Sequence, residues 1–283
     1  MAKNYRAELV GVFGCPVDEN PTGVVEEAAF AALGLNYRYL TIRVAPDDLE
    51  DAVKGIRAFN MRGINLTIPY KVAVLSYLDT LTKAAEIIGA VNTVINDQGK
   101  LTGENTDGKG YLISLAKAGV PIQGKHLTVL GAGGAARAIA VESALAGAGR
   151  VTIINRDVRR GAELAALIHT RTGVRADYVP WDRVFSIPQD TDILTNATSV
   201  GLFPHTNEKP DVNYDSLRAG MVVTDVIFND PNSLFLGEAK KRGALTIDGL
   251  GMLVNQGALN FKLWTGQEAP VEVMERALKK EFS

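Results

Sequence analysis

At 283 residues the chain is long for a single hydrophobic core and suits two domains of ordinary size. Its 46% hydrophobic and 22% charged residues are typical of a globular protein. Lys and Arg total 30 against 32 Asp and Glu, so the formal net charge of -2 excludes the basic surface of nucleic-acid and anionic-membrane binders. The sequence contains no run of about 18 apolar residues, so we expect no membrane span.

The start of the chain and its few sulfur and imidazole groups indicate a compartment and exclude some site types. Residues 1–8 are polar and lack the apolar core of a signal peptide. Cys15 is the only cysteine, so we expect a cytoplasmic protein without an intramolecular disulfide. The histidines, at 126, 169 and 205, are widely separated, which predicts no metal site.

The N-terminal half alternates β-branched runs with amphipathic stretches, which predicts an α/β fold with mostly parallel strands. Acidic residues at 47 and 48 predict the start of a helix that carries Leu49, Val53, Ile56 and Phe59 at helical spacing. Asp97-Gln98-Gly99 indicates a hairpin turn. We expect a helix over 24–33 and strands over 7–13, 37–44, 63–68, 90–96 and 100–103.

The same alternation continues in a second α/β unit that begins near Lys125. Helical stretches between its strands predict helices on both faces of a sheet. We expect strands over 126–130, 151–155, 175–179, 192–196, 221–226 and 244–247, a helix over 134–146, and two closing helices, the second over 271–282.

The first strand of this second unit carries a dinucleotide-binding fingerprint. It runs into Gly131-Ala132-Gly133-Gly134-Ala135-Ala136 and then into a helix, which is the context that G-x-G-x-x-G/A requires. Gly131 permits the tight turn, Gly133 lets the backbone approach a pyrophosphate, and small Ala136 allows close packing of helix and strand. The helix N-terminus then presents N–H groups to the phosphates.

The end of the next strand bears on the choice of cofactor. It reads Asn155-Arg156-Asp157, with Arg159 and Arg160 following. An acidic side chain here accepts a hydrogen bond from a ribose 2′-hydroxyl and repels a 2′-phosphate. Asp157 therefore favours NAD, while Arg156 and Arg160, which can pair with a phosphate, keep NADP as the alternative.

Four further stretches place Lys, Asn, Asp or Gln at the ends of apolar runs, where α/β sheets line a crevice. Each polar residue taken alone could be a cap or turn residue; Asp107, for example, could cap a helix. The four stretches are Asn65–Lys71, Gly89–Thr93, Asn105–Gly108 and Asp248–Gly257.

Together with Thr195–Gly201, Asp225–Pro231 and Phe261–Gly266, these stretches resemble the shikimate dehydrogenase family over nearly the whole chain. The resemblance implies an N-terminal α/β substrate domain, residues 1–106 completed by helices at 251–283. It also implies a Rossmann-like dinucleotide-binding domain over 107–250.

The resemblance further implies the roles of single residues. Lys71 and Asp107 correspond to the catalytic pair: the lysine relays the hydroxyl proton while hydride leaves the same carbon, and the carboxylate orients the ammonium. Thr67, Asn92 and Gln256 correspond to residues that hydrogen-bond the ring hydroxyls. The implied cofactor-binding positions are Gly131, Ala132, Gly133, Gly134, Ala135, Asn155, Arg156, Asp157, Arg160, Thr198, Val226, Gly249 and Met252.

The sequence departs from the family in the N-terminal loop, which usually offers two serines to the substrate carboxylate. Asn20 and Thr22 take those positions, and Asp18 and Glu19 add negative charge. Phe228, also among the substrate-binding positions, stands where the family commonly has a tyrosine. We therefore expect retained dehydrogenase chemistry with shikimate as a poor or secondary substrate.

The expected ligands are a dinucleotide and a small cyclic hydroxy acid, in a monomer or homodimer, with a place in aromatic amino acid biosynthesis. Quinate or another polyol acid remains an alternative substrate. A non-catalytic sensor of the NAD pool would have lost Lys71 or Asp107, and both are present. A folate dehydrogenase/cyclohydrolase shares the two-domain plan, but its own catalytic motifs are not found.

Overall fold

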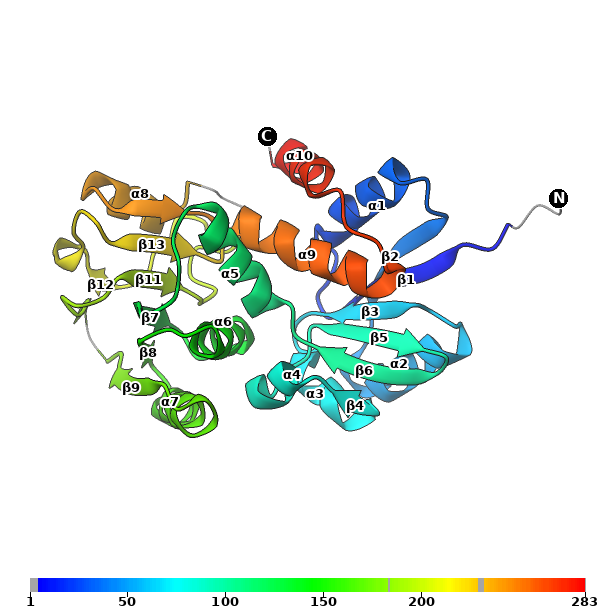
Figure 1. The fold of residues 1–283 in the computed structure, drawn as a ribbon, viewed down its shortest axis with the longest axis horizontal. Coiled ribbons are helices and arrows are strands. Elements are labelled where there is room, and N and C mark those ends of the chain that lie inside the picture. The colour runs from blue at the N-terminus through cyan, green and yellow to red at the C-terminus, as the bar shows by residue number, and fades with distance from the viewer. Residues whose placement is uncertain (1–4, 183, 229–231, 283) are drawn as a thin grey trace. The chain divides into compact units, whose positions relative to one another are not determined.

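The computed structural model describes residues 5–182, 184–228 and 232–282. The first half of the polar start and the end of the Asp225–Pro231 motif, residues 229–231, lie outside the described residues. Contacts divide the chain into two compact units, which we call the substrate unit, residues 1–106 with 254–283, and the nucleotide unit, residues 107–253 (Figure 1). The border expected after residue 250 lies three residues earlier than the observed one, in the first turn of helix α9 (Gly249–Thr265).

The substrate unit is built on a six-stranded sheet of order β2-β1-β3-β5-β6-β4. Strands β1, β2 and β3 are mutually parallel, β5 and β6 form an antiparallel hairpin, and β4 joins β6 in parallel. The strands are β1 (Glu8–Gly14), β2 (Tyr37–Arg43), β3 (Gly63–Leu66), β4 (Thr80–Leu81), β5 (Thr93–Asp97) and β6 (Lys100–Glu104).

Helices cover this sheet, and the segment that returns from the far end of the sequence closes its core. Trp264 is buried and its Nε1 donates to the Val94 carbonyl at 3.1 Å, while Phe261 stacks on Phe30 with ring centroids 5.4 Å apart. The helices are α1 (Thr22–Ala32), α2 (Leu49–Ala58), α3 (Tyr70–Ala73), α4 (Lys83–Ile88), α9 (Gly249–Thr265), which starts in the nucleotide unit, and α10 (Val271–Glu281), with short 3₁₀ turns η1 (Pro46–Asp48) and η2 (Val74–Tyr77).

Local chemistry accounts for most of these elements, with one correction. The β5–β6 turn passes through Gln98 at φ 52° and Gly99 at φ 93°, as a two-residue hairpin loop requires. Leu49 and Ile56 are buried on α2 as expected. Phe59, expected on the same apolar face, is 72% exposed because the helix ends at Ala58 and the chain turns away there.

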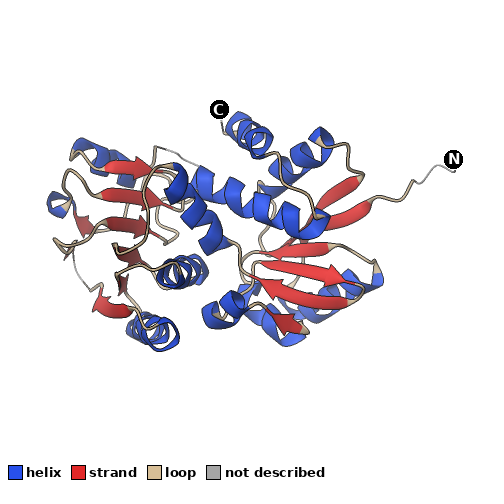
Figure 2. Cartoon of the chain, viewed as in Figure 1, coloured by secondary structure: helices blue, strands red, loops and turns tan. Residues whose placement is uncertain are grey.

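The nucleotide unit is a doubly wound parallel sheet with helices packed around it (Figure 2). Its strand order is β14-β13-β11-β7-β8-β9. Strand order reverses between β7 and β11, and such a switch point is where open α/β sheets bind ligands. Its strands are β7 (His126–Leu130), β8 (Arg150–Asn155), β9 (Arg175–Pro180), β11 (Ile193–Asn196), β13 (Val222–Asp225) and β14 (Leu245–Ile247). Its helices are α5 (Asp107–Lys117), α6 (Gly134–Leu145), α7 (Val158–Thr172), α8 (Leu234–Lys241) and the 3₁₀ turn η3 (Tyr214–Ser216); β10 (Phe185–Ser186) and β12 (Val212–Asn213) form a small second sheet.

The described part of the chain lacks a membrane-spanning helix and a cluster of metal ligands. None of its helices is both long and apolar enough to cross a membrane. Within the same residues, no three His, Cys, Asp or Glu side chains gather in a way that could hold a metal ion.

Candidate active site

The segment that carries Lys71 is positioned by the ends of β1 and β3. The Thr67 amide donates to the Phe13 carbonyl at 3.0 Å, and the Tyr70 hydroxyl, on a side chain only 2% exposed, donates to the Val44 carbonyl. A Cβ on Gly14 would lie 2.4 Å from the Thr67 Cγ2, so only glycine at the end of β1 lets Thr67 approach. Lys71 follows in α3, and its carbonyl accepts from the Val91 amide at 2.7 Å.

A buried cluster of amides and hydroxyls joins two predicted substrate-binding residues, Asn92 and Gln256. The Asn92 Nδ2 donates to Thr106 Oγ1 at 3.0 Å and more weakly to Gln256 Oε1 at 3.4 Å. The Asn260 Nδ2 also donates to Gln256 Oε1, at 3.1 Å. Because the Gln256 oxygen is occupied in this way, the group that Gln256 can present to a ligand is its Nε2 donor.

Sequence reasoning missed three members of this cluster: Thr93, Thr106 and Asn260. The Thr93 and Thr106 hydroxyls each lie 2.8 Å from the Asn260 Oδ1, and all three residues are buried. The spacing of Gln256 and Asn260, four residues apart on one helix, was the available signal, since such residues share a face. We call these residues the amide cluster: Asn92, Thr93, Thr106, Gln256 and Asn260.

The N-terminal loop keeps its polar groups but turns them in specific directions. The Asn20 Oδ1 accepts from the Thr22 amide at 3.0 Å, so the side chain of Asn20 closes the turn before α1 and has its Nδ2 left as a donor. The Thr22 side chain is buried and lies close to the Tyr39 hydroxyl. That hydroxyl in turn donates to the Asn65 Oδ1 at 2.8 Å, which ties the loop to β3.

Asp107 is the first residue of α5 and directly follows Thr106 of the amide cluster. It is 7% exposed. The start of α5 packs tightly on α6, because a Cβ on Gly108 would lie 2.3 Å from the Ala138 carbonyl oxygen. This packing holds the segment that carries Asp107 within the nucleotide unit.

The predicted dinucleotide turn has the geometry that such a ligand requires. Gly131 adopts φ 109°, and its amide donates to the Ile154 carbonyl at 2.8 Å. A Cβ on Gly133 would meet no protein atom within 4 Å, so the open space over its backbone suits an approaching pyrophosphate. No side chain caps the start of α6, which leaves its first N–H groups for an anion. These residues fit a dinucleotide.

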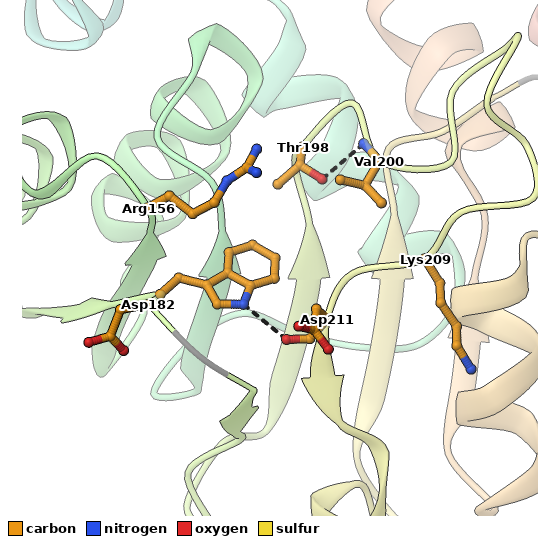
Figure 3. Close-up of a pocket in the computed structure, with 7 residues that line it drawn as sticks. Arg156, Asp182, Thr198, Val200, Lys209 and Asp211 are labelled. Carbon is orange, nitrogen blue, oxygen red and sulfur yellow. Dashed lines mark hydrogen bonds between the residues drawn. The ribbon is translucent and has the colours of Figure 1, made fainter.

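A pocket lies at the carboxyl ends of β8, β9 and β11 and includes the predicted cofactor positions Arg156 and Thr198 (Figure 3). The Trp181 Nε1 donates to the Asp211 carbonyl at 3.0 Å, and the Thr198 Oγ1 accepts from the Val200 amide. Both carboxylate oxygens of Asp157 have partners, because Oδ1 caps α7 by accepting from the Arg160 amide at 3.0 Å and Oδ2 lies 3.6 Å from the Arg160 Nε. The lining residues are Arg156, Trp181, Asp182, Thr198, Val200, Lys209 and Asp211.

The other predicted cofactor positions lie at the same edge of this sheet. Val226 follows β13, and its amide donates to the Asn196 carbonyl. Gly249 packs so closely on the segment after β13 that a Cβ would lie 2.5 Å from the Ile227 carbonyl oxygen. Met252 is half-buried in the first turn of α9. Phe228, predicted as substrate-binding, is half-buried at the end of this β13 segment of the nucleotide unit.

Models of known protein families match three successive parts of the chain. Residues 12–94 match the shikimate dehydrogenase substrate binding domain, 114–226 the shikimate/quinate 5-dehydrogenase domain, and 249–279 the shikimate 5′-dehydrogenase C-terminal domain. A shikimate dehydrogenase (NADP(+)) from Desulforamulus reducens is 42% identical over 99% of this chain and 97% of its own. The chain belongs to the shikimate dehydrogenase family. It is an oxidoreductase that uses a nicotinamide dinucleotide and acts on a hydroxyl group.

Solved structures of similar sequence have the same fold as this chain. A ligand-free 5-ketofructose reductase from Gluconobacter superposes with a TM-score of 0.93 at 47% identity, covering 99% of this chain and 100% of that one. The shikimate 5-dehydrogenase from Listeria monocytogenes, solved with shikimate and NAD, gives 0.90 at 37% identity and 96% coverage of both chains. The family relationship therefore extends over both units.

Proposed function

We propose that this protein interconverts a secondary alcohol and a ketone on a small cyclic polyhydroxylated substrate, with Lys71 and Asp107 as its catalytic pair. The bound dinucleotide supplies the hydride acceptor and donor. Lys71 takes the hydroxyl proton on oxidation and returns it on reduction. The Asp107 carboxylate stabilises the positive charge of the protonated lysine. We also propose that the reaction takes place in the cytoplasm.

The amide cluster is the observation that supports this substrate class. Its side chains are uncharged, buried and linked by hydrogen bonds, with Gln256 offering Nε2 as a donor. Such groups bind a ligand rich in hydroxyls more tightly than one without them, because a buried donor that the ligand leaves unpaired has lost its hydrogen bond to water.

Shikimate itself is proposed to be a poor substrate because the loop offers an amide and a threonine in place of two serines. Initial rates with shikimate and with quinate test this. We expect kcat/KM for shikimate below about 10⁵ M⁻¹s⁻¹, which is below the range of efficient enzymes. In whichever reaction proceeds fastest, Lys71→Ala should lower kcat by about 10²-fold or more. A K71A variant as fast as the wild type would remove Lys71 from the mechanism.

A second candidate substrate is an uncharged keto sugar. The relative solved as a 5-ketofructose reductase is 47% identical to this chain, whereas the relative solved with shikimate is 37% identical. A keto sugar presents hydroxyls to the amide cluster and needs no carboxylate subsite at Asn20 and Thr22. Rates of NADPH oxidation with 5-ketofructose, measured beside the reverse reaction on shikimate, discriminate the two candidates.

We further propose NADP(H) as the preferred dinucleotide. The preference for NAD expected from Asp157 is not confirmed, since the Desulforamulus relative is named for NADP(+) and the Listeria structure holds NAD. The geometry offers a reason: the Asp157 carboxylate is engaged by the α7 N-terminus and Arg160, and Arg156 lines the pocket. An arginine at this strand end accommodates a 2′-phosphate.

Two substitutions test the cofactor proposal. Arg156→Ala should raise KM for NADP⁺ by about tenfold and leave KM for NAD⁺ within about twofold, since only the former carries the 2′-phosphate. Asp157→Ser keeps a capping oxygen while it removes the charge, and should shift the preference further toward NADP⁺. Equal effects of R156A on both dinucleotides would contradict the proposed contact.

A further inference from the structure

One buried carboxyl of the substrate unit takes no part in the chemistry described above. Glu26, on the inward face of α1, is fully buried, and neither carboxylate oxygen has a hydrogen-bond partner among the described residues. A buried polar group without a partner costs free energy, so its presence calls for a physical explanation.

The surroundings of Glu26 connect it to the substrate-binding loop. It lies one helical turn after Thr22 on the same buried face of α1. Tyr39, whose hydroxyl donates to the Asn65 Oδ1 and lies close to Thr22, is also close enough to interact electrostatically with the Glu26 carboxyl. On the other side, Glu26 Oε1 lies 3.5 Å from the position that a Cβ on Gly257 would take, next to Gln256 of the amide cluster.

We propose that Glu26 is a positioning residue that sets the charge selectivity of the substrate site, favouring uncharged polyhydroxylated ligands over carboxylates. It acts on the loop of Asn20 and Thr22 through its electrostatic field, from a position one turn further along α1 and near Tyr39. This inference rests on the proposed function and deepens it, because it names the charge of the substrate class.

Electrostatics gives the direction of the effect. Burial, with a smaller contribution from neighbouring Glu27, raises the pKa of Glu26 well above its ordinary value. A ligand carboxylate at the loop repels the ionised form of Glu26 through a poorly screened interior, so such a ligand binds best while Glu26 is protonated. An uncharged ligand of the same shape does not distinguish the two forms. The titratable groups that face Glu26 are Glu27 on α1 and Tyr39 on β2.

The test compares two ligands that differ only in charge: shikimate and its primary carboxamide. Their dissociation constants are measured by calorimetry with wild type, Glu26→Gln, and the matched control Glu272→Gln, whose side chain on α10 is 90% exposed. We expect the ratio Kd(shikimate)/Kd(carboxamide) to rise about tenfold from the acidic to the alkaline end of the pH range in which wild type and E272Q stay folded. In E26Q the ratio should be low and independent of pH.

Parallel pH profiles in wild type and E26Q would overturn the proposal, as would failure of the wild type to bind either ligand. A purely structural role of Glu26 would change both Kd values alike and leave their ratio unchanged. Lys71 and other charged groups also affect the ratio, but they are present in both proteins and cancel when wild type is compared with E26Q. Hydride transfer is not needed for this readout, so a protein that shows the predicted ratios and oxidises neither substrate would contradict only the proposed function.

Discussion

Single side chains in the substrate unit are held by close approaches that allow little substitution. Gly14 is an example, because a Cβ there would displace Thr67. Gly14→Ala is therefore expected to lower kcat/KM at least tenfold, because Lys71 would be displaced together with Thr67. Gly237→Ala is the control, since its Cβ would meet nothing within 4 Å in helix α8, and alanine there should stabilise by about 0.5–1 kcal/mol. Steady-state kinetics and urea denaturation together separate the two outcomes.

Asn260 is a second residue whose loss has a defined cost. Its Oδ1 serves two threonine hydroxyls and its Nδ2 serves Gln256. Asn260→Ala removes three hydrogen bonds from the buried amide cluster and leaves Asn92 as the remaining partner within it, so we expect a loss of about 2 kcal/mol in the free energy of unfolding. The Gln256 amide should also lose its orientation, which raises KM for the substrate. Unchanged stability and KM would show that water replaces the asparagine fully.

At the scale of elements, the hairpin between β5 and β6 offers a stabilising change. Gln98 occupies the left-handed region at φ 52°, where asparagine and glycine are favoured. Gln98→Asn is expected to raise the free energy of unfolding by a few tenths of a kcal/mol up to about 1. Gly99→Ala, at φ 93°, should lower it. Both are read by urea denaturation, and opposite signs for the two variants are the decisive result.

The same elements show how far sequence reasoning reaches. Strands of the nucleotide unit and the turn at Gly131 follow from β-branched runs and a glycine pattern, because these signals are local. Phe59 was misplaced because periodicity does not mark where a helix ends. The sequence did not reveal that Asn260 and Thr106 belong to the site, because the hydrogen bond between them connects positions 154 residues apart. The Glu26 environment likewise depends on α9 and β2.

For the whole molecule, Glu26 predicts how stability varies with pH. Its pKa is raised in the folded state, so the native protein holds a proton that the unfolded chain releases above the ordinary value of 4.5. Its contribution to stability is full below that pH and is lost as the pH rises toward the folded pKa. Glu26→Gln should therefore be more stable than wild type at pH 8, with a smaller difference at pH 5. Thermal unfolding at both values measures this, and an equal difference at the two pH values would contradict the shift.

The substrate unit is assembled from two stretches of chain that the ribosome makes at different times. The nucleotide unit, residues 107–253, is synthesised without interruption, whereas residues 1–106 must wait for 254–283. Until residues 254–283 have been synthesised, the core positions of Trp264 and Phe261 are unfilled and the amide cluster lacks Gln256 and Asn260. A nascent chain thus contains the whole nucleotide unit first, and its substrate unit is complete only once residues 254–283 have been added.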